Sequence, residues 1–197
     1  MDYKKVKQII LEKLERELLA VYTYHGLHHT LDVLKVTGDL CQSEGISRYE
    51  TTLLKTAALF HDSGFTVSPK DHEATGCLIA KDVLPNYGYA PNEIERICGM
   101  IMATKIPQSP KNLLEQIICD ADLDYLGRDD FFAIGNTLFE ELKVLGILES
   151  EWQWNNMQVK FLENHAYHTE TTKNLREAKK QTHIAAVKQL LSNNVII

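Results

Sequence analysis

Apolar residues recur every three or four positions along most of the chain, a spacing that places them on one face of an α-helix. In residues 3–22, Val6, Ile10 and Leu14 follow this spacing while Lys and Glu fill the positions between them. A second such segment, from Leu27 to Glu44, is followed by a glycine, the residue that most often ends a helix. The same period predicts further helices over residues 48–62, 73–84, 92–103, 112–126, 130–146, 151–165 and 170–192.

Turn-forming residues are few and stand between these segments. The chain holds 5 Pro and 10 Gly among 197 residues, which favours long helices over a fold of many strands. Two predicted helices begin with a capping-box pattern, Ser47 with Glu50 and Ser150 with Gln153. No internal repeat of roughly 20–50 residues is present, and no long polar linker divides the chain. We therefore predict an all-α fold with a single domain over residues 1–197.

Composition narrows the class of protein further. Hydrophobic residues make up 44% of the chain and charged residues 24%, as in an ordinary soluble globular protein. The formal net charge of −6 argues against a nucleic-acid polymer as partner, because such binding depends on clustered Lys and Arg. No apolar run approaches the roughly 20 residues that span a bilayer, so no membrane partner is expected. The four cysteines form no C-x-x-C pair and the first residues carry no apolar signal segment, so we expect buried free thiols and a cytoplasmic location.

The first chemically active group lies in residues 24–33, where histidines gather. On a helix, His25, His29 and Asp32 lie three or four positions apart and would share one face. His28 lies about 100° around the helix from His29 and is expected to pack or to face solvent instead.

Two further groups place acids inside apolar helical sequence. His61 and Asp62 end a helix that is apolar for most of two turns, although a core histidine beside a loop-capping acid is the commoner explanation for such a dipeptide alone. Asp120, Asp122 and Asp124 follow an apolar run, and Asp122 shares a face with apolar residues, so it is expected to point inward. Asp120 and Asp124 would support it or face water, and helix-capping acids are the alternative for the whole segment. A buried carboxylate needs a cation or several hydrogen bonds.

Taken together, the three groups predict a metal site. His29, His61, Asp62 and Asp122 would supply two nitrogens and two oxygens to one divalent ion, leaving open positions for water and substrate. This mixed set suits Mn, Fe, Co, Ni or Zn, and suits Mg less well.

The order of these residues resembles the HD superfamily of metal-dependent phosphohydrolases, whose signature is H…HD…D. Here it reads His29…His61-Asp62…Asp122 within residues 20–130. The resemblance implies an all-α bundle of the HD type with the metal held between helices, a motif core over about 20–130 and C-terminal helices 130–197 packed on it. It also favours Asp122 over Asp120 as the last ligand. Two-metal members use further histidines after the HD pair. His72 could be one of these, but none occurs between His72 and His165, so one ion per chain is expected, with a second only if substrate or carboxylates hold it.

The resemblance further implies hydrolysis of a phosphomonoester or phosphodiester of a nucleotide or related small phosphorylated metabolite by metal-activated water. Asp62 would ligate the ion and orient the water, and His25 would donate a proton to the leaving oxygen, as a histidine at this spacing does in similar members. Some nucleotidase members carry a catalytic Glu four positions after the His of the HD pair, where this chain has Phe65. The alternative function is a non-catalytic HD-fold module that binds metal and nucleotide and regulates a partner.

Phosphate also requires cationic side chains. Lys105 stands where a helix gives way to a loop bounded by prolines, and we expect it at the rim of the site. Arg176 is the candidate from the basic C-terminal segment, since a guanidinium binds phosphate through two hydrogen bonds. The alternative for that segment is a solvated helix face with Lys at ordinary spacing.

Overall fold

The computed structural model describes residues 1–193, and in them all regular structure is helical, which confirms the all-α prediction. The last four residues of the predicted 1–197 domain lie outside the described residues. The elements in chain order are α1 (Tyr3–Glu17), α2 (Leu27–Ser43), α3 (Arg48–Phe60), η1 (Ser63–Thr66), α4 (His72–Val83), η2 (Leu84–Tyr87), α5 (Pro91–Ala103), α6 (Leu113–Asp122), η3 (Asp124–Gly127), α7 (Phe131–Val144), α8 (Glu151–Asn164) and α9 (Glu170–Asn193).

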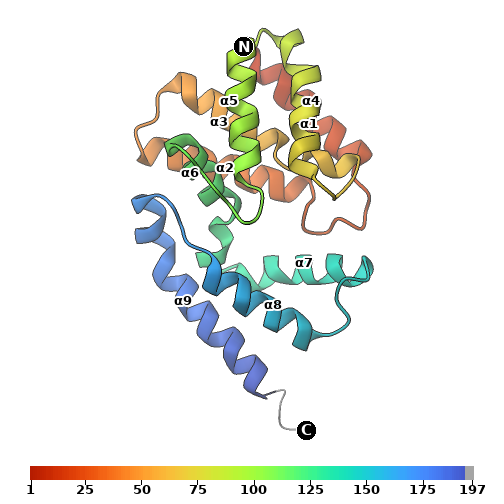
Figure 1. The fold of residues 1–197 in the computed structure, drawn as a ribbon, viewed down its shortest axis with the longest axis vertical. Helices are drawn as coiled ribbons and strands as arrows, with labels where there is room; N and C mark the ends of the chain where they lie inside the picture. The colour runs from red at the N-terminus through yellow and green to blue at the C-terminus, as the bar shows by residue number, and fades with distance from the viewer. Residues whose placement is uncertain (194–197) are drawn as a thin grey trace.

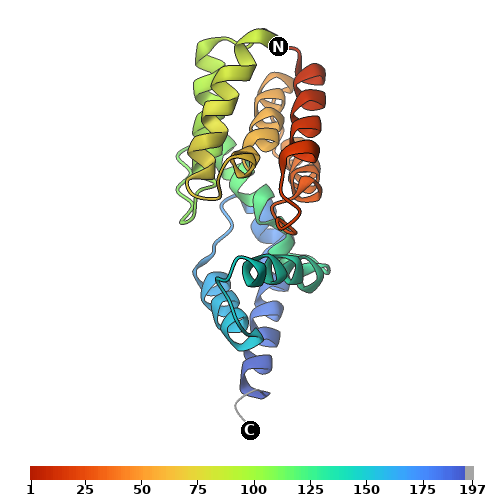
Figure 2. The ribbon, with the colours of Figure 1, turned by 90° about the vertical axis from the view of Figure 1, so that its right-hand side faces the viewer.

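The helices form two stacked groups (Figures 1 and 2). Helices α1 to α6 make a bundle around one apolar core, to which Ile10, Leu54 and Ile97 contribute. Helices α7, α8 and α9 lie below it, around a smaller core that includes Phe131 and Leu162. Within residues 1–193, no helix combines the length and the apolar character needed to cross a membrane. The molecule therefore has a seam between two cores, and η3 lies at that seam.

Helix boundaries agree with the sequence where local signals set them. Ser47 accepts a hydrogen bond from the N–H of Glu50 (3.2 Å), and Ser150 accepts one from the N–H of Gln153 (3.3 Å), so both predicted N-termini are confirmed. The first helix ends at Glu17 instead of residue 22. Its C-cap residue, Leu18, is extended (ψ 134°), and the segment that follows leads to Tyr24 and His25, whose backbone N–H groups donate to Glu141 of α7.

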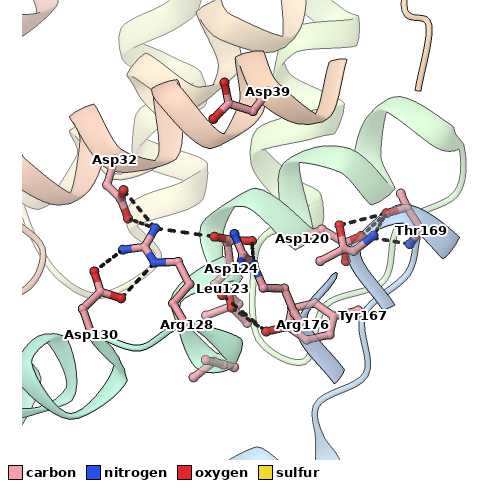
Figure 3. A network of polar contacts seen from close by, with 12 residues as sticks. Asp32, Asp39, Asp120, Leu123, Asp124, Arg128, Asp130, Tyr167, Thr169 and Arg176 are labelled. Atoms are coloured by element: carbon pink, nitrogen blue, oxygen red, sulfur yellow. Dashed lines mark hydrogen bonds and ion pairs between the residues drawn. The ribbon is translucent and has the colours of Figure 1, made fainter. Parts of the chain in front are cut away.

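The helix predicted over 112–126 is also divided. It ends at Asp122, and a 3-10 turn, η3, then leads towards α7. This turn lies directly against α9: a Cβ atom on Gly127 would stand 2.5 Å from the carbonyl oxygen of Arg176, so only glycine fits without displacement. The Arg176 Nε donates to Asp124 at 2.7 Å, and Arg128 joins Asp124 to Asp32 of α2 (Figure 3). The turn therefore ties the two groups of helices together.

Candidate metal centre

Three packed helices bring the predicted ligands to one place. His29 lies in the first turn of α2, His61 and Asp62 directly follow α3, and Asp122 is the last residue of α6. Helix α2 packs against both α3 and α6, and α3 also contacts α6. Because all four residues stand at helix ends that meet at the seam, residues separated by as many as 93 positions come into contact.

The donor atoms of these residues are spaced like the ligands of one ion. The His29 Nε2 lies 3.1 Å from the Asp122 Oδ1 and 3.3 Å from the His61 Nε2. The Asp62 Oδ2 lies 3.2 Å from the His61 Nε2 and 3.4 Å from the His29 Nε2. Nitrogen and oxygen ligands about 2.0–2.2 Å from a metal stand about 3.0–3.5 Å from one another. His29, His61 and Asp122 thus form a group that could hold a metal ion.

Burial and hydrogen bonding support a cation at this point. The His61 Nδ1 is 2.8 Å from the backbone oxygen of Ala58, which leaves the Nε2 of the same ring directed at the group. The Asp62 Oδ2 is buried and accepts no hydrogen bond. A carboxylate oxygen in such surroundings is costly unless a positive charge compensates it, so the donor set fits a divalent ion.

The imidazoles and carboxylates of the group shift one another's pKa values. Burial opposes the charged form of each residue, but the carboxylates of Asp62 and Asp122 raise the pKa of His61 well above its usual value. In the same way, burial is outweighed by His29 and His61, which lower the pKa of Asp122 to about 2. Both pKa shifts have the same cause: the carboxylates favour positive charge beside them, and a divalent ion bound by these residues would supply it.

Asp62 also faces a second pair of residues through its other oxygen. The His72 Nε2 lies 3.4 Å from the Asp62 Oδ1 and 3.4 Å from the Glu73 Oε1, and Glu73 is buried. Gly64 permits this arrangement, because a Cβ atom there would lie 2.0 Å from the backbone oxygen of His72.

His25 is held beside the group by an acid that sequence reasoning missed. His25 precedes α2, whose N-cap is Gly26. The prediction that His25 lies on one helical face with His29 and Asp32 is therefore wrong. Its Nδ1 lies 2.5 Å from the Oε1 of Glu141, and its ring stacks on Phe65 with centroids 4.2 Å apart. Glu141 is only 1% exposed. The one sign of Glu141 in the sequence is that an acid stands within the apolar stretch of α7.

The remaining candidates lie elsewhere. Lys105 pairs with the exposed Asp71 at 2.7 Å, and Arg176 pairs with Asp124. Neither side chain lines the cavity beside the group. Asp120 turns away from the group: its carboxylate accepts the N–H groups of His168 (2.7 Å) and Thr169 (2.8 Å) at the start of α9 (Figure 3). Asp120 and Asp124 are both buried, so neither faces water, which is one of the two roles expected of them. The other role, support of Asp122, stays a prediction.

A cavity of about 210 Å³ opens from the group into the seam. Its near end is formed by ionisable side chains, among them His25, His29, Asp62 and Asp122. Its far end is lined by apolar side chains of η3, α7 and α8. The arrangement can place a polar, charged part of a ligand at the histidines and an apolar part between the two cores.

Comparisons with known proteins agree with the fold. The family model of the HD domain matches residues 26–124. A predicted HD superfamily hydrolase from an uncultured Thermotogales bacterium is 20% identical with a TM-score of 0.62, covering 96% of this chain and 91% of its own. Bacillus subtilis YpgQ, solved in complex with ADP, is 18% identical with a TM-score of 0.67, covering 98% and 97%. A Lactobacillus plantarum protein is 18% identical with a TM-score of 0.68, covering 97% of each chain. No curated protein matches the chain.

Proposed function

Because the chain belongs to the HD domain family, we propose that it is a metal-dependent phosphohydrolase acting on a phosphate ester of a nucleotide or related small metabolite. The observation that carries the proposal is the buried group of His29, His61 and Asp122, with the unbonded Asp62 oxygen beside it, at one end of a cavity. The ADP bound by Bacillus subtilis YpgQ supports a nucleotide as the class of substrate.

In this proposal His29, His61, Asp62 and Asp122 hold one divalent ion. The donor set of two imidazoles and two carboxylates suits Mn, Fe, Co, Ni or Zn. Such an ion lowers the pKa of water and polarises a phosphoryl oxygen.

The chain's own groups complete the reaction. Asp62 orients the attacking water, whose oxygen bonds to phosphorus as the bond from phosphorus to the ester oxygen breaks. His25 lines the cavity and donates a proton to the departing ester oxygen, so the products are an alcohol and inorganic phosphate, or a phosphomonoester from a diester. Glu141 holds the His25 ring by a hydrogen bond at the His25 Nδ1, which leaves the His25 Nε2 to carry that proton. Lys105 and Arg176 stay candidates for phosphate binding only if their present carboxylate partners release them.

The test combines metal content with release of phosphate from a panel of esters in Mn, Mg, Co and Ni. We expect Asp122→Ala to lower the affinity for the ion at least about 100-fold and to abolish turnover. The matched control is Asp120→Asn, which should keep the ion but lose about 1–3 kcal/mol of stability, because its hydrogen bonds hold α9. His25→Ala should keep the ion and lower kcat about 10²–10⁴-fold.

Two results would contradict the proposal. If Asp122→Ala kept the metal content of the wild type, the proposed metal centre would be wrong. Tight nucleotide binding without turnover in any metal would instead favour the non-catalytic regulatory module.

A further inference from the structure

The two ends of the cavity differ sharply in chemistry. The end at the metal centre carries the carboxylates of Asp62, Glu73 and Asp122 together with imidazoles. The far end is built from aromatic and aliphatic side chains, chiefly Phe131, Trp154 and Phe161. A ligand that fills both ends therefore has one charged end and one flat or apolar end.

One polar side chain interrupts the apolar end. Gln158 of α8 lines the cavity and is only 9% exposed, and its Oε1 is buried without a hydrogen-bond partner. An unbonded amide oxygen in apolar surroundings is costly, so this group is placed to bond something that the protein itself does not supply. Opposite it, Gly135 leaves room: a Cβ atom there would lie 3.7 Å from Trp154 and 4.0 Å from the Gln158 Nε2.

Positive side chains are missing from the cavity wall. Among the described residues that line it there is no Lys and no Arg. The arginines at the seam are engaged with carboxylates, Arg128 with Asp32 and Arg176 with Asp124. A single phosphoryl group would be balanced by the ion and the imidazoles, whereas a second or third would face carboxylates without a counter-charge.

From these three features we propose that the substrate is a phosphomonoester with one phosphoryl group, whose alcohol carries a flat, uncharged ring with a hydrogen-bonding edge. The ring lies in the apolar end of the cavity, and the Gln158 amide hydrogen-bonds its edge and so determines specificity. This inference rests on the proposed function for the reaction itself. A nucleoside monophosphate has the required chemistry and is the probe for the test.

The kinetic test compares four compounds on the metal-loaded full chain: a nucleoside monophosphate, the diphosphate and triphosphate of the same nucleoside, and ribose 5-phosphate. We expect kcat/KM for the monophosphate to exceed each of the other three at least about tenfold. Gln158→Leu should lower kcat/KM for the monophosphate about tenfold and leave that for ribose 5-phosphate unchanged, which a loss of folding alone would not do. Equal or faster turnover of the diphosphate or triphosphate would overturn the proposal, as would an unchanged ratio of monophosphate to ribose 5-phosphate in Gln158→Leu.

A binding test keeps this inference separate from the reaction. The chain has two tryptophans, of which Trp152 is 52% exposed and Trp154 lines the cavity, so Trp152→Phe leaves Trp154 as the fluorescent reporter. The monophosphate should change Trp154 emission, and ribose 5-phosphate at the same concentration should not. If no ester is hydrolysed, the proposed function fails, but a ring-dependent Trp154 signal still supports the binding mode. Absence of a ring-dependent change in Trp154 emission overturns the proposed binding mode.

Discussion

The side chain that most restricts His25 is Glu141. One of its oxygens faces the His25 Nδ1, and the other accepts the backbone N–H groups of Tyr24 (2.8 Å) and His25 (3.1 Å). A single buried carboxylate thus fixes both the ring and the backbone that carries it. This explains why a residue outside any helix can hold a defined position beside the metal centre.

We therefore predict that Glu141→Gln lowers kcat about 10–100-fold while KM and metal content stay close to those of the wild type. The amide oxygen can still accept from the backbone N–H groups, but the NH2 group then faces the His25 Nδ1 and cannot accept a hydrogen bond from it. Steady-state kinetics with metal analysis would measure this. Glu140→Gln is the matched control, since Glu140 is exposed and pairs only with Lys143. A kcat equal to that of the control would show that Glu141 has no role in positioning His25.

A second residue-level prediction concerns His165, between α8 and α9. Burial lowers the pKa of His165 to about 4, and the positive charge of Lys180 acts in the same direction. In the unfolded chain a histidine titrates near 6.5. The unfolded state therefore binds the proton first, and the free energy of unfolding decreases as the pH falls from about 6.5 towards 4.

At about pH 5, protonation of His165 in the unfolded chain should lower the free energy of unfolding by ~2 kcal/mol relative to pH 7. His165→Gln removes the titration, so its stability relative to the wild type should rise by that amount over the same interval. Urea unfolding of both proteins at the two pH values measures the change. A difference that is independent of pH would mean that His165 is not protonated on unfolding.

Among the candidate site residues, those with a local signal were predictable from the sequence. The His61-Asp62 dipeptide at the end of an apolar helix and Asp122 in an apolar run both carried one, and the structure brings them together with His29. Glu141 carried almost none, because beside Glu140 it resembles a solvated helix face. Its role depends on a contact 116 residues away, which hydrophobic periodicity does not encode.

At the scale of elements, the periodicity located the helices but not the breaks between them. Residues 112–126 follow one helical period, yet the helix ends at Asp122 because η3 is held by contacts with α9. Both acids two positions from Asp122 bind the C-terminal segment: Asp120 of α6 accepts from Thr169, just before α9, and Asp124 of η3 accepts from Arg176 of α9 (Figure 3). The C-terminal helix thus fixes the segment on which the last predicted ligand stands.

We predict that Gly127→Ala destabilises the protein by about 2–4 kcal/mol, because the new Cβ would collide with the backbone of α9. Gly99→Ala is the matched control. Gly99 lies inside α5, and a Cβ there meets only the end of the Glu115 side chain at 3.4 Å, so helix propensity should stabilise that variant slightly. Chemical denaturation of both variants gives the comparison. Equal stabilities would mean that α9 does not pack on η3 as described.

At the scale of the whole molecule, the metal centre joins helices that belong to one core, and its cavity reaches into the other. The sequence predicts each helix through local spacing, but the seam arises from the packing of two groups of helices. Its position is therefore a property of the tertiary structure, as is the chemistry of the cavity.

Metal removal tests this view of the molecule. The donors converge only in the folded chain, so an ion bound by them would stabilise the folded state by ~2.7 kcal/mol at 100 times its Kd. For a domain of this size we expect EDTA to lower Tm by about 5–10 °C, and added Mn to restore it. His61→Ala should show no EDTA-dependent shift, whereas His28→Ala, at an exposed neighbour of His29, should behave like the wild type. If His61→Ala retained the full shift, the ion would bind elsewhere, and the convergence of α2, α3 and α6 would serve only to build the core.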